Sequence, residues 1–360
     1  MELRRLFTEG SAGFDELDRF LLRAIADRAH GRDPEEPPYA RDVLFERAEQ
    51  RSVTHLFFDT PFDETGTEAA GPSPFEAART FARTALAENV RSWGEIARTF
   101  ADAGVRVAGF KGPFLNAVLG RPVERAPMSV DLDLLVSRDT LDHAVGLLES
   151  LGYVKGLGIK DHRFYRLGQH GIQDLEGEQG SYGQIAPMAR LLPLPELDHW
   201  ADRLPAWFPK RDLVPASAGV RSLTSIDLHF DLGHTDQGLD HPVPAGELLD
   251  GVVTADYLGT ELTTLDLPTM TWLLSYRAYL DSALFGERRF KLFADIAVTL
   301  RSGGWSDAVV TAAIDRYPFI RTPIEETLRF LRTELGVEPA TYTSYAWTGA
   351  GTGNIPASKS

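Results

Sequence analysis

The sequence predicts an α/β protein in which a core at residues 105–235 follows an N-terminal helical segment, 1–104, and precedes a C-terminal helical domain, 236–340. Two observations lead to this prediction. Apolar residues alternate with period two in "SVDLDLLV" (129–136) and "SIDLHFDL" (225–232), as they do in half-buried strands. The stretches on either side instead repeat apolar residues at helical spacing.

The N-terminal segment is expected to hold two helices. Residues 14–31 are apolar at helical spacing and end at a glycine, and residues 76–103 show the same pattern before Gly104. Residues 32–75 between them are rich in Pro, Asp, Glu and Gly, and we expect them to be irregular and to lie on the surface.

The core is predicted to alternate strands and helices. "VRVAGF" (105–110) is typical of a strand, and "KGPFLNAVLG" (111–120) of a turn followed by a short helix with Pro113 near its start. The second strand, 129–136, leads into a helix at 137–153, which has a Ser/Asp cap and ends near Gly152.

The second half of the chain begins with an irregular pattern at 154–220, parts of which are expected to pair as hairpins. The third clear strand is 225–232, and from 268 onward the pattern becomes helical. Residues 341–360 are rich in Thr, Ser and Gly, and we expect a flexible tail there.

The two alternating strands raise a chemical question, because each places carboxylates on its polar face. Asp131 and Asp133 lie about 6–7 Å apart on one strand face, where they repel each other. Asp227 and His229 hold similar positions on the other strand. Hard cations such as Mg²⁺ prefer all-oxygen ligands and usually bind together with the phosphates of a substrate. The alternative is a solvated sheet face with no metal.

Composition excludes several other classes of function. The net charge is −15 with nine histidines not counted, which speaks against general binding to nucleic acids or anionic membranes. The absence of cysteine excludes disulfides, thiolate catalysis and Cys-based zinc sites. No apolar leader and no apolar run of about 18 residues occurs, so we expect a cytoplasmic protein without membrane spans.

Several motifs occur in an order that resembles a known family. A long helix leads to "AGVRVAGFKG" (103–112), and an arginine, Arg125, precedes the Asp-x-Asp strand that ends in "LLV". A helix closing in "LGY" (151–153), a strand with "DLH" (227–229) and the helical "LFADIA" (292–297) follow. Residues of about 85–300 thereby resemble the uncharacterised bacterial nucleotidyltransferases of the DNA polymerase β-like superfamily.

This resemblance implies a polymerase β-like core with a mixed sheet and assigns roles to site residues. Asp131 and Asp133 are implied to hold one or two Mg²⁺ ions, with Asp227 as the third metal-binding carboxylate and as a group that helps to deprotonate the acceptor. Lys111 and Gly112 stand where the superfamily's Gly-Ser pair meets the triphosphate. The sequence reads Lys-Gly there in place of Gly-Ser. The spacing along the sequence between Arg125 and Asp131 is also longer than the family's usual spacing between its arginine and the Asp-x-Asp motif.

The reaction implied is transfer of a nucleoside monophosphate from a nucleoside triphosphate (NTP), such as ATP, to an acceptor, with release of pyrophosphate. The acidic composition favours a small-molecule acceptor, as in natural-product biosynthesis or antibiotic resistance, over a nucleic acid. Two alternatives remain open: a non-catalytic descendant that binds a nucleotide or a partner, and a toxin-like enzyme acting on tRNA, which would need a basic groove.

Other residues near these motifs have simple structural interpretations. His229 is expected to orient Asp227, contact the nucleotide or act as a base, or else to satisfy a neighbouring loop. Lys111 would neutralise phosphate or lie solvated in its turn. Lys291 and Asp295 are spaced i, i+4 and fit a surface ion pair. The aromatic residues of "WLLSYRAYL" (272–280) are typical of a helix core.

Overall fold

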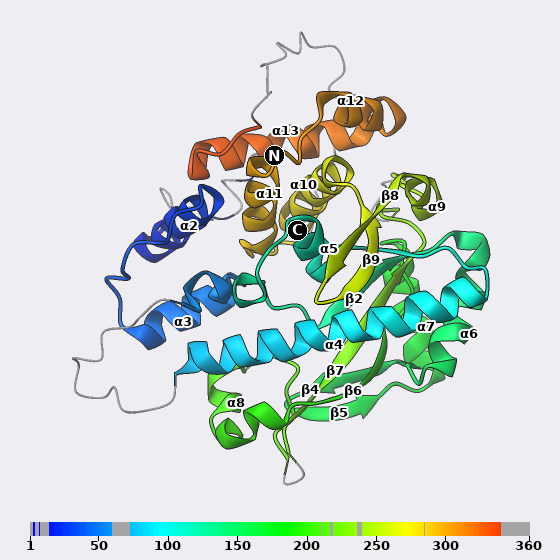
Figure 1. Cartoon of the computed structure of the whole chain (residues 1–360), viewed down its shortest axis with the longest axis horizontal. Helices are drawn as coiled ribbons and strands as arrows, with labels where there is room; N and C mark the ends of the chain where they lie inside the picture. The colour runs from blue at the N-terminus through cyan, green and yellow to red at the C-terminus, as the bar shows by residue number, and fades with distance from the viewer. Residues whose placement is uncertain are drawn as a thin grey trace.

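A seven-stranded mixed sheet organises the part of the chain that the structure describes (Figure 1). The structure is a computed structural model and describes residues 3, 7, 14–59, 73–209, 211–216, 219–235, 240–283 and 285–339. The expected flexible tail, 341–360, lies outside the described residues. The strand order is β3-β6-β7-β2-β1-β9-β8. The seven strands are β1 (Ala108–Phe110), β2 (Asp131–Leu135), β3 (Val154–Lys155), β6 (Met188–Pro193), β7 (Arg221–His229), β8 (Val252–Tyr257) and β9 (Thr260–Leu265).

The predicted α/β class with a mixed sheet is confirmed. β2 pairs parallel with β7 and antiparallel with β1, while β1 pairs parallel with β9. The α-helices are α2 (Glu16–Ala29), α3 (Arg41–Gln50), α4 (Pro74–Asp102), α5 (Gly112–Val118), α6 (Leu141–Ser150), α7 (Gln169–Gly180), α8 (Leu204–Trp207), α9 (Ala245–Leu248), α10 (Leu267–Ala283), α11 (Lys291–Arg301), α12 (Asp307–Arg316) and α13 (Arg321–Phe330).

One face of the sheet packs against α4, the long helix that crosses the sheet in Figure 1, and against α6. Leu132 and Leu134 of β2 contribute to this core, and Trp93 of α4 is buried in it. The predicted alternation therefore buries the apolar side of β2 here. Gly109 permits close packing on the same face, because a Cβ atom at this position would lie 2.1 Å from the Phe114 ring of α5.

The opposite face of the sheet packs against the C-terminal helices. Leu135 of β2, Phe110 of β1 and Leu265 of β9 share a core with residues of α10, α11 and α13. Trp272 and Tyr276 are buried in α10, in agreement with the core interpretation of the aromatic stretch. Asp131 and Asp133 point to this second face, since they share the parity of Leu135 along the strand.

The expectation of an irregular 32–75 segment is wrong in part. Residues 41–50 form α3, a short helix without a capping side chain, and residues 54–57 form a 3₁₀ turn. Leu44, Phe45 and Ala48 of α3 are buried, so tertiary packing stabilises a helix whose sequence pattern is weak.

The 154–220 stretch is also more regular than the sequence indicates. It contains the expected hairpin, formed by β4 (Leu157–Lys160) and β5 (Arg163–Arg166), but also helix α7, whose residues are all at least partly exposed. A helix without a buried face leaves no apolar periodicity to detect. The boundaries 104/105 and 235/236 stay predictions, although β8 and β9 place residues 252–265 in the same sheet as the core.

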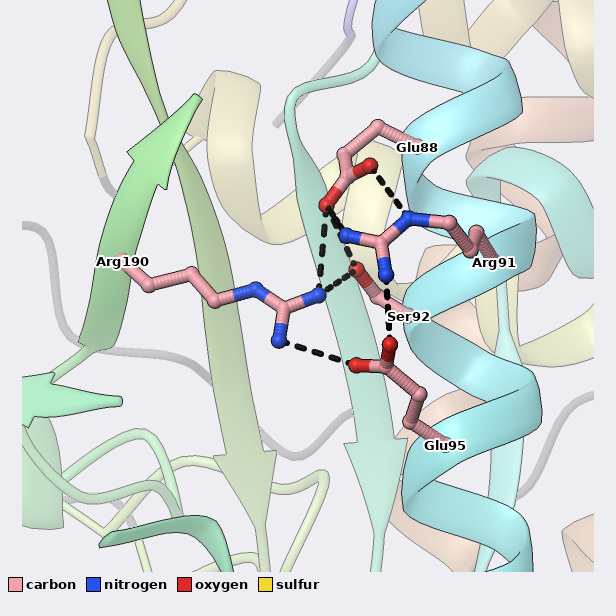
Figure 2. Close-up of polar contacts among 5 residues, drawn as sticks. All are labelled: Glu88, Arg91, Ser92, Glu95 and Arg190. Atoms are coloured by element: carbon pink, nitrogen blue, oxygen red, sulfur yellow. Dashed lines mark hydrogen bonds and ion pairs between the residues drawn. The ribbon is translucent and has the colours of Figure 1, made fainter. Parts of the chain in front are cut away.

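A polar cluster joins β6 to α4 (Figure 2). The Arg190 guanidinium of β6 donates to Glu95 Oε2 at 2.9 Å, to Ser92 Oγ at 2.9 Å and to Glu88 Oε1 at 3.2 Å. Its Cζ also lies 4.8 Å from the centroid of the Tyr153 ring. Arg91 binds the same two glutamates from α4 itself.

We expect Arg190→Ala to lower the free energy of unfolding by about 1–3 kcal/mol, because it leaves two half-buried glutamates without their partner from the sheet. Arg91→Ala is the matched control, since the Arg91 side chain is 56% exposed and its loss should cost less than about 1 kcal/mol. Urea unfolding of the two variants checks this, and equal losses would contradict it.

Candidate active site

The parallel pairing of β2 and β7 brings the predicted carboxylates together. Asp133 stands opposite Asp227 in the register, and Asp131 stands opposite Ser225. Residues paired in this way project to the same side of a sheet. The structure therefore places the three aspartates on one sheet face, the face that packs against the C-terminal helices.

Asp133 is the buried and fully partnered member of the set. Its Oδ1 accepts from Lys111 Nζ at 3.0 Å and lies 3.2 Å from His229 Nε2. Burial alone would raise the pKa of Asp133, but the Lys111 charge and the His229 hydrogen bond outweigh it and hold the pKa well below its usual range. These two partners therefore favour the ionised form of Asp133.

Asp131 is held by a neighbour on its own chain segment. Ser129 Oγ donates to Asp131 Oδ1 at 2.8 Å, and Asn89 of α4 fixes this segment by donating to Ser129 O at 3.1 Å. Gly112 makes room for the serine, because a Cβ atom there would lie 3.1 Å from Ser129 Oγ and its φ of +45° suits glycine. Gly112 therefore allows α5 to begin close to Asp131.

Asp227 is the unpartnered carboxylate of the three. Among the described residues it accepts no hydrogen bond and forms no ion pair. Burial raises the pKa of Asp227 well above its usual value, and the charges of Asp131 and Asp133 raise it further. Asp227 is therefore the carboxyl group of the three whose ionised form the surroundings favour least.

His229 contacts Asp133 and not Asp227. It is 3% exposed, and its ring packs edge-on against Phe110 with 5.3 Å between centroids. Burial lowers the pKa of His229 even though Asp133 favours its charged form. A neutral imidazole that donates from Nε2 to Asp133 satisfies this geometry, so His229 orients Asp133 from the side.

A cavity opens over Asp131 and Asp133, between the sheet and the C-terminal helices. Lys111, Ser129, Asp131 and Asp133 line it from the core, and Ala278, Asp281, Ser282, Glu287, Arg289, Lys291, Leu292, Phe293 and Asp295 line it from α10, α11 and the segment between them. Asp227, His229 and Gly112 adjoin these residues without being part of the described lining.

The expected surface pair between Lys291 and Asp295 is wrong. Asp295 is buried and binds Arg121 at 3.0 Å, while Lys291 Nζ donates to the Met128 carbonyl at 3.2 Å. Arg121 also donates to Asn116 of α5 at 2.9 Å. The two α11 residues thus tie this helix to the core near the cavity. Sequence reasoning missed Arg121, Glu287 and Arg289, because nothing local marks them.

Arg125 lies elsewhere. Its half-exposed side chain is 3.6 Å from Asp33 and 3.9 Å from Asp59, and it is not among the residues that line the cavity. The structure therefore gives no contact between Arg125 and the three aspartates.

The carboxylate oxygens of the three aspartates are the chemical type of ligand that divalent cations prefer. Asp131, Asp133 and Asp227 offer hard oxygen ligands, and the unpartnered Asp227 charge is one that a cation would neutralise. In the described part of the chain, however, no three Asp, Glu or His side chains converge closely enough to hold a metal ion as they stand. The Lys111 ammonium instead neutralises Asp133.

Comparison with known proteins gives one match. The family model described as an uncharacterised nucleotidyltransferase matches residues 42–316, which include every residue of the candidate site. No curated protein and no solved structure matches the chain. Within the described residues, the structure has no helix with the length and apolar character needed to cross a membrane.

We expect Asp227→Asn to stabilise the metal-free protein at pH 7.5 by roughly 1 kcal/mol. A carboxyl group whose pKa is raised by folding binds more protons in the folded state than in the unfolded state. Its contribution to the free energy of unfolding is therefore greatest near pH 4 and below, and is lost as the pH rises through the folded-state pKa. The asparagine removes this loss. Urea unfolding in EDTA at pH 7.5 and pH 4 measures it.

The matched control is Asp256→Asn on the exposed part of β8, which should leave stability unchanged at both pH values. A gain from Asp227→Asn that is equal at pH 4 and pH 7.5 would contradict the assignment of the effect to carboxylate repulsion.

Proposed function

Because the chain belongs to the uncharacterised nucleotidyltransferase family, and is therefore a transferase, we propose that Asp131, Asp133 and Asp227 form its metal-dependent active site. The observation that carries this proposal is the in-register pairing of Asp133 with Asp227, on a sheet face that borders a cavity. The family supplies the general activity, the transfer of a nucleoside monophosphate from an NTP.

The proposed reaction is an in-line displacement at the α-phosphorus. An acceptor oxygen or nitrogen forms the new bond to this phosphorus, the bond to the bridging oxygen of the β-phosphate breaks, and pyrophosphate leaves. Asp227, which has no hydrogen-bond or ion-pair partner among the described residues, is proposed to take the proton of the acceptor. One or two Mg²⁺ ions held by the three aspartates would supply charge for the attacking and leaving oxygens.

Phosphate binding is proposed for both walls of the cavity. Lys111 and the Gly112 backbone lie on the core side, beside the aspartates. Lys291 and Arg289 lie on the helical side. A triphosphate placed between them would link the sheet to α11, and catalysis would consist mostly of positioning and electrostatic stabilisation.

The acceptor is proposed to be a small molecule, as in natural-product biosynthesis or resistance. The side chains that line the cavity include five carboxylates and three cations: Asp131, Asp133, Asp281, Glu287 and Asp295 against Lys111, Arg289 and Lys291. Once a triphosphate occupies the three cations, the remaining carboxylates favour a neutral or amine-bearing acceptor over a second polyanion. This supports the small-molecule acceptor over tRNA.

Nucleotide and metal should raise the melting temperature together. We expect one of ATP, CTP, GTP and UTP to raise it in the presence of Mg²⁺, and the rise to vanish in the Asp131→Asn/Asp133→Asn variant, because binding to the native state alone stabilises it. Release of pyrophosphate in the presence of candidate acceptors then tests transfer. If no NTP shifts the melting temperature, the nucleotide-binding site is refuted and the non-catalytic alternative gains.

Lys291→Met should weaken NTP binding by about tenfold, since one ammonium–phosphate contact is lost from a cavity that is partly shielded from solvent. Arg301→Met is the matched control, because Arg301 is exposed at the other end of α11. Calorimetric titration with the preferred NTP measures both. An unchanged dissociation constant for Lys291→Met would remove Lys291 from the phosphate site.

A further inference from the structure

We propose that Lys111 is the resident cation of the carboxylate cluster, and that a divalent metal ion reaches Asp133 only together with a nucleotide whose phosphates draw the ammonium away. This inference rests on the proposed function, because it concerns how the same site loads its metal. It adds an order of binding that the assignment of metal ligands does not contain.

The Lys111 ammonium is held from two directions. Its Nζ lies 3.0 Å from Asp133 Oδ1 and 4.7 Å from the centroid of the Phe110 ring. The side chains of Lys111 and Asp133 are 22% and 8% exposed, so the ion pair is largely shielded from water. A charge pair shielded in this way is much stronger than a surface pair, and breaking it requires a replacement for each partner.

The backbone conformation of Lys111 is also unusual. Its φ is +64° and its ψ is −173°, a strained region that residues other than glycine rarely adopt. Gly112 follows with a φ of +45°. A glycine at 111 would relieve the strain but would lose the contacts of the lysine side chain with Asp133 and Phe110.

The ammonium occupies one of the two carboxylate oxygens that Asp133 offers to a metal ion. Asp133 Oδ1 already accepts from Lys111 and lies within hydrogen-bonding distance of His229. Magnesium binds carboxylate oxygens at about 2.0–2.1 Å, and its charge would repel an ammonium held at the same carboxylate. Among the described residues, the three aspartates share one sheet face but do not converge into a metal-holding group while Lys111 is paired with Asp133.

The charge of Lys111 is felt beyond Asp133. Burial raises the pKa of Asp227 and of Glu287, and the Lys111 ammonium opposes the rise at both carboxyl groups. One lysine therefore offsets part of the negative charge of the whole site. The phosphates of an NTP give it an alternative anionic partner in the same cavity, and the metal then takes its place at Asp133.

Binding of Mn²⁺ alone, followed by electron paramagnetic resonance of the free ion, tests the inference without requiring turnover. We expect Lys111→Met to bind Mn²⁺ about tenfold more tightly than the wild type when no nucleotide is present. Lys111→Arg keeps a cation and should bind as weakly as the wild type. Lys160→Met, an exposed lysine at the end of β4, should change nothing. Circular dichroism confirms that each variant is folded.

The outcomes separate this inference from the proposed function. Equal or weaker Mn²⁺ binding by Lys111→Met, or tight binding by Lys111→Arg, would overturn the role of Lys111 while an NTP with Mn²⁺ still raises the melting temperature of the wild type. If no NTP with Mn²⁺ raises the melting temperature of the wild type, the metal–nucleotide site itself fails and the inference fails with it.

Discussion

The pairing of Asp133 with Asp227 across two parallel strands is the constraint around which the rest of the structure is arranged. Two carboxylates on neighbouring strands of a buried sheet face repel each other, and the interior cannot screen them as water does. Lys111 and His229 contact Asp133, and Ser129 donates to Asp131. These contacts offset part of the electrostatic cost. The positive-φ turn at Lys111 and Gly112 is the backbone arrangement that brings the first of these partners to the site.

Local patterns were sufficient to predict the elements that bury one face. The alternation of 129–136 and 225–232, and the helical periodicity of 76–103, correspond to β2, β7 and α4. Two helices were missed for different reasons. α7 has no buried residue, whereas α3 buries Leu44, Phe45 and Ala48 but shows only a weak periodic pattern in its sequence. Their stability comes from contacts that are distant in sequence, and propensity alone does not report those contacts.

In the candidate site, too, some features could be predicted from the sequence and others could not. Strand parity alone places Asp131 and Asp133 on one face of their strand and Asp227 on the polar face of its own strand, because the period of two fixes the side. That the two faces coincide follows from the parallel pairing of β2 with β7. The partners of these aspartates could not be predicted in this way. Lys111 is 22 residues from Asp133, and Arg121 is 174 residues from Asp295, so only the folded chain reveals these ion pairs. The i, i+4 spacing of Lys291 and Asp295 suggested an ion pair between them, but in the structure Asp295 binds the buried Arg121 instead.

The return of the chain to the sheet after residue 235 limits how this protein can be divided or recombined. β9 covers the free edge of β1, and β8 extends the sheet further. A fragment that stops before β8 would leave the short β1 as an open edge beside the buried ring of Phe110, a template for association between chains. The sheet therefore continues past residue 235, and a cut at that point would separate β8 and β9 from the strands they extend. On the C-terminal side, a division of the chain that keeps the sheet whole has to fall after β9, which ends at Leu265.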